Sequence, residues 1–272
     1  MRISAFGTAL LAWVAVGHPL PADAQVDQQR AQEYFKEARA LCERDGGRLW
    51  GVSLCAPLVI ADLRTHTLAT SQSAPDAPWP RVLGLVNAPI EWGGTTWVSF
   101  NWDFVAGLAS PRSRRELFIH EMFHRVQPGL GLMQLAAANE HVDAMDGRYW
   151  LRLEWRALAR ALQESGAARV DAVRDALAFR KARRALYAGS AEDERKVEIT
   201  EGLPNYTGIV VAASPADAIA SAVDLLLGTA GIPDSVVRTF PSTTIPAYGL
   251  LLDASSGGWR RQCATPTTSA PS

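Results

Sequence analysis

Residues 118–127 read FIHEMFHRVQ, in which two histidines and a glutamate stand among apolar side chains. His120 and His124 are four positions apart, so on a helix they lie on one face, one turn from each other. Two imidazoles placed in this way can bind one metal ion. Glu121 points about 100° away around the helix, where it can reach a water molecule on that ion. The H-E-x-x-H spacing therefore predicts a metal site on a helix.

The neighbouring sequence predicts that this helix is buried. Ser110-Pro111 is typical of a helix start and Pro128-Gly129 of a stop, so the helix should run to about Val126. Histidine and glutamate side chains inside an apolar helix cost several kcal/mol unless their polar atoms are satisfied. Metal coordination satisfies them, whereas the alternative is a chance triplet on a surface helix.

A catalytic zinc site has three protein ligands and one open position, so a third ligand must come from another part of the chain. The stretch EITEGLPNYTG places Glu201 inside a predicted helix among apolar residues, where an unpaired carboxylate would be costly. Glu201 is the favoured ligand, and Glu154, His141 and Asp143 are the alternatives. Glu154 lies on the apolar face of another predicted helix, and Glu198 lies one turn before Glu201. Both are expected to support the ligands through hydrogen bonds.

Together the two motifs resemble those of the gluzincin metallopeptidases. In that family a glutamate on a later helix, often followed by glycine in an E-G-[FL]-[AT] segment, completes the H-E-x-x-H site. Glu201-Gly202-Leu203 matches this segment, whereas Pro204 stands where a small helix-forming residue is usual. Proline has no amide hydrogen, so a kink is expected just after the ligand. The resemblance covers these two helices and the preceding hairpin, well under half of the chain.

The resemblance implies a zinc-dependent hydrolase, and among hydrolases a peptidase. The expected ligands of Zn²⁺ are His120, His124 and Glu201. Glu121 would take a proton from the attacking water and deliver it to the leaving group. Tyr206 and Tyr248 are candidate donors to the oxyanion that develops in the reaction, with ordinary packing as the alternative role.

The predicted substrate is a peptide or a protein. The segment TTWVSFNW at 95–102 resembles the edge strand along which gluzincins bind extended peptides, because an edge strand has unpaired main-chain groups. An ordinary core hairpin is the alternative. Two other functions fit the same motifs: a zinc hydrolase of a non-peptide amide or ester, and a non-catalytic metal-containing binding module. A purely structural metal site needs no general base, which argues against the binding module.

The sequence predicts an α+β fold that is mainly helical and zincin-like. A small N-terminal β-sheet or hairpin is expected to pack on the metal-bearing helix, and a helical bundle is expected to follow. Residues 82–92 and 95–102 form the hairpin, joined at Gly93-Gly94, and residues 58–60 form a further short strand. Helical periodicity dominates the chain after residue 110.

Residues 1–24 have the pattern of an export signal. Arg2 precedes a short apolar run, and Ala22-Asp23-Ala24 matches a cleavage site. A retained N-terminal anchor is the alternative. After cleavage near Ala24, a single domain over residues 25–263 is expected in the periplasm or outside the cell. No stable membrane span and a disordered tail at 264–272 are also expected.

The cysteines indicate the kind of compartment in which the protein is found, and the charge balance bears on nucleic-acid binding. Cys42 and Cys55 flank a turn-rich stretch and predict a local disulfide in an oxidising compartment, with two buried thiols as the alternative. Cys263 is left over. The chain has 27 Lys and Arg against 28 Asp and Glu, a net charge of −1. There is no basic excess of the kind that nucleic-acid binding requires.

Overall fold

A computed structural model describes residues 25–229 and 235–263 of the chain. The predicted export signal at 1–24 and the predicted tail at 264–272 lie outside these residues. The chain divides into two compact units, one ending at Val126 and the other beginning at Gln127. Together they form a mainly helical α+β protein, as predicted. A single domain over residues 25–263 stays a prediction, because compactness alone does not define a folding unit.

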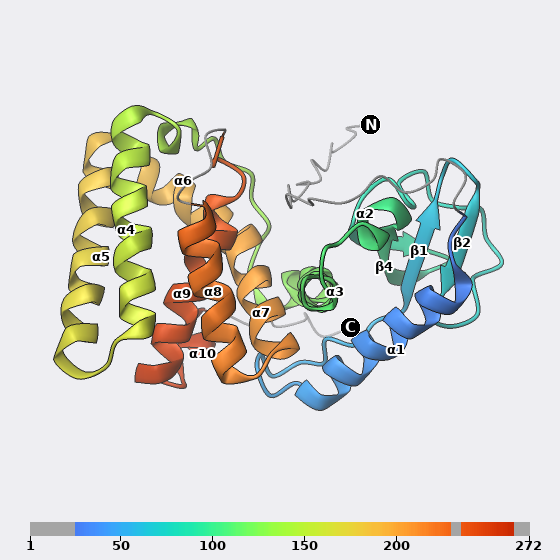
Figure 1. The fold of residues 1–272 in the computed structure, drawn as a ribbon. Coiled ribbons are helices and arrows are strands. Elements are labelled where there is room, and N and C mark those ends of the chain that lie inside the picture. Colours follow the sequence, from blue (N-terminus) through green and yellow to red (C-terminus); the bar gives the residue numbers. More distant parts are fainter. Residues whose placement is uncertain (1–24, 230–234, 264–272) are drawn as a thin grey trace, which may run out of the picture. The chain divides into compact units, whose positions relative to one another are not determined.

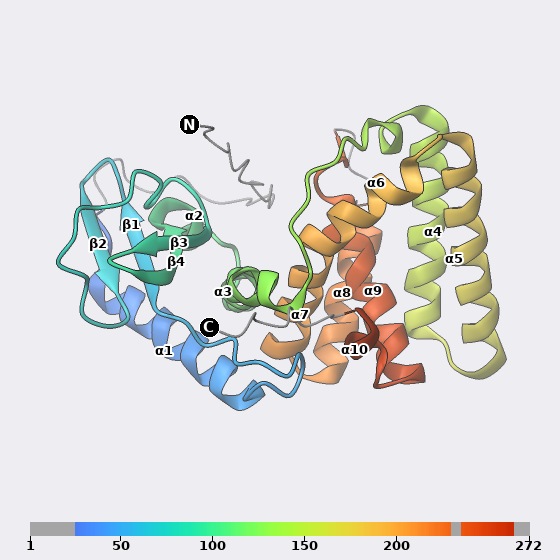
Figure 2. The same ribbon diagram turned by 180° about the vertical axis from the view of Figure 1, so that it is seen from behind.

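The first unit contains a four-stranded mixed sheet in the order β2-β1-β4-β3 (Figures 1 and 2). Its strands are β1 Leu58–Asp62, β2 Thr67–Thr70, β3 Ala88–Trp92 and β4 Thr95–Asn101. β1 and β4 are parallel, and the other two pairs are antiparallel. Gly93 and Gly94 join β3 to β4 with φ angles of 59° and 75°, the left-handed conformation that two-residue hairpin turns need. The predicted strand at 58–60 and the predicted hairpin are confirmed, although the first strand of the hairpin begins at Ala88 and residues 82–87 form turns.

The resemblance of β4 to a peptide-binding edge strand is wrong, because β4 lies inside the sheet between β1 and β3. Its burial explains this position: Trp97 and Ser99, on one face, and Phe100, on the other, are all buried. The polar groups on the strand bind the main chain of a neighbouring loop. Ser99 Oγ accepts from Gly84 N, and Asn101 Nδ2 donates to Gly84 O at 2.7 Å.

Three helices complete the first unit: α1 Gln28–Asp45, α2 Trp102–Ala106 and α3 Pro111–Val126. Asp27 caps α1 by accepting from Arg30 N at 3.0 Å. α3 packs on the sheet, where the Phe118 ring stacks on Phe100 at 4.0 Å between centroids. This is the predicted contact between the sheet and the helix that carries both histidines.

The predicted disulfide between Cys42 and Cys55 is confirmed, and it ties the end of α1 to the segment before β1. Cys263 is free and exposed. None of the helices among the described residues is long and apolar enough to cross a membrane.

The second unit is a helical bundle (Figure 1). Among the described residues its α-helices and the π-helical turn η3 are α4 Met145–Gln163, α5 Gly166–Leu186, α6 Ser190–Val197, η3 Glu198–Gly202, α7 Leu203–Ala212, α8 Pro215–Thr229, α9 Phe240–Ser255 and α10 Trp259–Cys263. Two short 3₁₀ helices, η1 Pro128–Leu130 and η2 Glu140–Val142, precede α4. The core forms where α4, α8 and α9 meet, around Leu158, Leu226 and Phe240.

Candidate metal centre

The helix α3 places the histidines where the sequence predicts. Ser110 Oγ accepts from Ser113 N at 3.0 Å, which satisfies one of the main-chain donors left over at a helix start. The helix ends at Val126, and a 3₁₀ turn beginning at Pro128 follows. The H-E-x-x-H stretch therefore occupies the last turns of a capped helix whose apolar side chains, including Phe118 and Phe123, are fully buried.

The two imidazoles face each other on one side of α3. His120 Nε2 and His124 Nε2 are 3.0 Å apart, and the rings lie at 70° to each other. Two nitrogens bound tetrahedrally to one zinc ion, each at about 2.0–2.1 Å, would be about 3.3 Å apart. His120 is 0% exposed, His124 is 9% exposed, and Glu121 between them is 2% exposed. The pair is thus arranged as two ligands of one ion, in a buried setting.

Glu201 lies in the π-helical turn η3, between α6 and α7. Leu203 N–H donates to Glu198 O, five residues back, instead of to Ile199 O as an α-helix requires. Pro204 follows and has no amide hydrogen to continue the α-helical pattern. The disturbance predicted at Pro204 therefore takes the form of a π turn, and the chain continues as α7 without leaving the helical state.

Glycine after Glu201 is required by packing. A Cβ on Gly202 would lie 2.4 Å from Ile245 Cγ1 and 3.0 Å from Pro241 O, both on α9. Gly249 on α9 has the reciprocal role, because a Cβ there would lie 2.3 Å from Tyr206 Cδ2. The turn that carries Glu201 is consequently held close against α9, and its main chain has little room to shift.

The structure brings the three predicted ligands together. His120, His124 and Glu201 are all buried, each offers one ligand atom, and these atoms lie within 4.8 Å of one another. Two imidazoles and one carboxylate form a donor set that suits zinc and leaves a coordination position open. The group could hold a metal ion.

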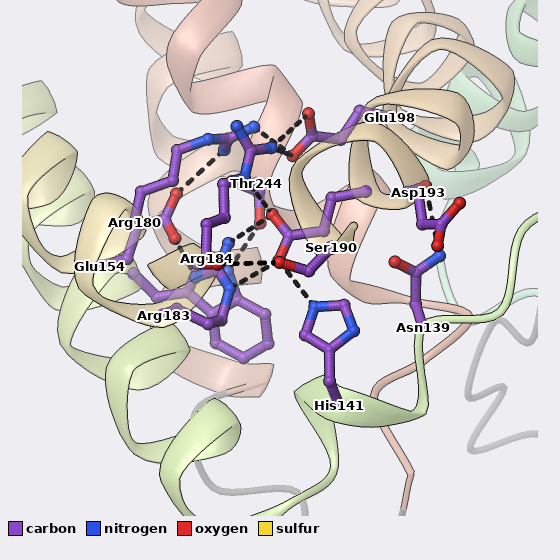
Figure 3. Close-up of polar contacts among 12 residues, drawn as sticks. Asn139, His141, Glu154, Arg180, Arg183, Arg184, Ser190, Asp193, Glu198 and Thr244 are labelled. Carbon is purple, nitrogen blue, oxygen red and sulfur yellow. Dashed lines mark hydrogen bonds and ion pairs between the residues drawn. The ribbon is translucent and has the colours of Figure 1, made fainter. Parts of the chain in front are cut away.

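The other residues predicted near the ligands have partners of their own (Figure 3). Glu154, a candidate support and an alternative ligand, accepts from Arg183 and from Arg180. Glu198 accepts from Arg180. His141, another alternative ligand, contacts Glu194 through Nε2 at 2.8 Å.

The remaining candidates are also engaged. Asp143 accepts from Val236 N at 2.8 Å. Tyr206 OH donates to Asp253 Oδ2 at 2.6 Å, and Tyr248 OH donates to Glu154 Oε1 at 2.9 Å. Burial raises the pKa of both phenols, and the charges of Asp253 and Glu154 respectively raise them further, so both tyrosines stay protonated.

The contacts of Glu154, Glu198 and His141 involve a buried ionic cluster in the helical bundle, here called the arginine–glutamate network. It consists of three glutamates and three arginines: Glu154, Glu194, Glu198, Arg180, Arg183 and Arg184. Glu194 accepts two bonds of 2.9 Å from Arg183 and one of 2.6 Å from Arg184. With three charges of each sign the network is internally neutral, so its buried charges are compensated.

The network was not predicted, although the sequence contains a signal for it. Arg180 and Arg184 are four residues apart on α5, and Glu194 and Glu198 are four residues apart on the next helical run. Two such stripes of opposite charge on consecutive helices can pair along their length.

Because of the network, the free energy of unfolding should decrease as the pH is lowered into the acid range. Burial alone would raise the pKa of Glu194, but the hydrogen bonds and charge of Arg183, with hydrogen bonds from His141 and Arg184, lower it to about 2. A carboxyl whose pKa falls from 4.5 to about 2 on folding contributes about 3 kcal/mol at neutral pH. This contribution is present above pH 4.5 and is lost as the pH falls toward 2. Urea unfolding at a series of pH values should show the loss.

Glu194→Gln tests the assignment of that pH dependence. Glutamine does not titrate, so the free energy of unfolding of this variant should fall less steeply between pH 4.5 and 2 than that of wild type. An identical slope in both proteins would show that other carboxyls cause the acid sensitivity.

Comparisons of the chain with protein-family models, with curated proteins and with solved structures find no match.

Proposed function

We propose that this protein is a zinc-dependent hydrolase, and specifically a metallopeptidase of the gluzincin type. The observation that carries the proposal is the convergence of His120, His124 and Glu201, whose ligand atoms lie within 4.8 Å of one another, with Glu121 beside the first histidine. A His₂Glu set is the donor set of catalytic zinc sites that keep one position open.

Zinc in this site would supply Lewis acidity, lowering the pKa of a water ligand toward ~7 and polarising a substrate carbonyl. Glu121 is assigned as the general base that removes a proton from the attacking water and later delivers it to the leaving group. Its burial keeps bulk water from competing for that proton. Glu121 and Glu201 together supply two negative charges, which balance the charge of one divalent ion.

Tyr206 and Tyr248 are the candidate donors to an oxyanion. Each hydroxyl has one proton, and each donates it to a carboxylate, Asp253 or Glu154. Either tyrosine would therefore have to exchange that partner for the substrate before it could assist the reaction.

Export to an oxidising compartment is part of the proposal. It is supported by the Cys42–Cys55 disulfide, since such bonds persist outside the reducing cytosol. A peptide or protein is the proposed substrate, because the site resembles those of peptidases in both motifs. A comparison of wild type with Glu121→Gln tests whether the site is catalytic.

Metal content is the first test of the proposal. Purified protein should hold one zinc ion per chain, removable by a chelator, and His120→Ala should lose it because two remaining ligands bind a divalent ion far more weakly than three. Elemental analysis by mass spectrometry measures the stoichiometry.

His66→Ala is the matched control. His66 is exposed and stacks on Trp79, and it does not belong to the group of possible metal ligands found among the described residues. This variant should keep its zinc. Absence of bound transition metal from wild-type protein refolded with zinc would contradict the proposal.

A further inference from the structure

The segment between α3 and α4 passes along the π turn that carries Glu201. Two side chains join them by hydrogen bonds, Gln127 from the segment and Thr200 from the turn. Gln127 Nε2 donates to Ile199 O at 2.7 Å. Farther along, Leu135 N donates to Thr200 Oγ1 at 2.9 Å, and Thr200 Oγ1 is 3.1 Å from Leu135 O. Both contacts fall on the two residues that immediately precede Glu201.

The Gln127 bond supplies a donor that the helix itself does not provide. In an α-helix Ile199 O would accept from the amide of residue 203, but Leu203 N–H donates to Glu198 O. In a π-helix Ile199 O would accept from the amide of residue 204, which is Pro204 and has no amide hydrogen. The carbonyl of Ile199 is thus left over in either helical pattern, and the Gln127 amide satisfies it.

Gln127 is held in place for this contact. Its side chain is fully buried, and its Oε1 accepts from Gln134 Nε2 at 3.3 Å. Since the amide is bonded at both ends, it has little freedom to rotate away from Ile199. Burial of this amide without hydrogen-bond partners would cost free energy, so its two hydrogen bonds favour the orientation that reaches Ile199 O.

The sequence positions of Gln127 and Ile199 show which two segments this hydrogen bond joins. Gln127 is the first residue after α3 and follows His124 by three positions, and Ile199 precedes Glu201 by two. One hydrogen bond therefore links the chain that leaves the histidine helix to the main chain of the π turn.

We propose that Gln127 is a positioning residue for the metal site: by fixing the carbonyl of Ile199 it sets where the π turn presents the Glu201 carboxylate. This inference rests on the proposed function, because it assumes that Glu201 is a zinc ligand. Groups that orient metal ligands typically change metal affinity by about 10- to 100-fold when removed.

Gln127→Met tests the inference. Methionine has a similar length and is tolerated in cores, but it cannot donate to Ile199 O. Zinc affinity, measured by competition with a chromophoric chelator, should fall at least ~10-fold in protein that circular dichroism shows to be folded without metal. Gln163→Met, at an exposed position of α4, is the matched control and should bind zinc like wild type.

The outcomes distinguish failure of the positioning role of Gln127 from failure of the proposed function. If wild type binds zinc and Gln127→Met binds it equally well, Gln127 has no positioning role, even if the melting temperature of the metal-free variant falls. If wild type binds no zinc, the proposed function itself fails. If Gln127→Met does not fold, Gln127→Leu replaces it, because leucine is smaller and also cannot donate to Ile199 O. Zinc binding by folded Gln127→Leu as tight as that of wild type would then overturn the inference.

Discussion

Glu121→Gln should keep its zinc and its fold but lose at least 100-fold in turnover. Glutamine has nearly the shape of glutamate, so the packing of α3 around this buried position is preserved. Its amide cannot accept a proton from the attacking water, and general-base catalysis typically contributes about 10²–10⁴-fold. The loss should therefore appear in kcat, with zinc content unchanged.

The experiment screens wild type and variant against a mixed peptide library at equal zinc content. Glu116→Gln is the matched control, because it makes the same chemical change on the same helix at a buried residue that pairs with Arg112. It should cleave peptides like wild type. Equal cleavage by wild type and Glu121→Gln would show that Glu121 is not the base.

Failure of every protein to cleave any peptide would reject the peptidase assignment. A screen of non-peptide amides and esters would then follow, since the same water chemistry suits those bonds. If wild type also turned over none of these compounds while holding zinc, a metal-containing binding module would be the better description.

The local part of the site could be predicted from sequence because its determinants are local. The spacing of His120 and His124 fixes their common face on any helix, and Ser110 and the proline after Gln127 mark the ends of that helix. Glu201 is indicated by its place inside an apolar helical stretch. The family resemblance adds the glycine that follows it, which the packing against α9 explains.

The pairing of strands could not be predicted in the same way. The alternation in β4 shows that it is a strand, but its neighbour β1 lies far earlier in the sequence. Ser99 pairs with Val59, 40 residues back, and no local pattern identifies that partner. An edge strand and a central strand differ in what covers them, which depends on the whole chain. The polar side chains of β4, Ser99 and Asn101, bind the main chain of a loop at Gly84.

The residues of helix α9 do not by themselves indicate a helix, for a related reason. Its sequence contains Pro246 in its interior and two adjacent threonines, all of which disfavour a helix in isolation. Tertiary contacts outweigh these preferences: Thr244 Oγ1 accepts from Trp155 Nε1 at 2.8 Å, and Gly249 fits against Tyr206. A helix that is stabilised mainly by contacts with its neighbours has only weak helical signals in its own sequence.

Arg183→Met should destabilise the protein by about 3–5 kcal/mol, the usual effect of removing one partner from a buried ion pair. The Arg183 side chain is fully buried and pairs with Glu154 and Glu194, which are fully buried as well. Methionine fills much of the same volume, so the loss reports the uncompensated carboxylates rather than a cavity. Urea unfolding of metal-free protein at neutral pH measures it.

Arg174→Met on the same helix is the matched control. Arg174 pairs with Asp171 at an exposed site, where such a pair is worth about 0–1 kcal/mol. A loss in Arg183→Met no larger than in this control would show that the network contributes nothing to stability.

The pH dependence of the Arg183→Met deficit distinguishes charge from packing. In wild type Arg183 is the main group that holds the pKa of Glu194 low, so without it this carboxyl should take up a proton at a higher pH. Protonation removes one of the uncompensated buried charges. The difference in unfolding free energy between wild type and Arg183→Met should therefore shrink as the pH is lowered from 7 toward 3. A difference that stays constant over that range would mean that the guanidinium acts by filling space, and that the three arginines and three glutamates are not coupled as the geometry indicates.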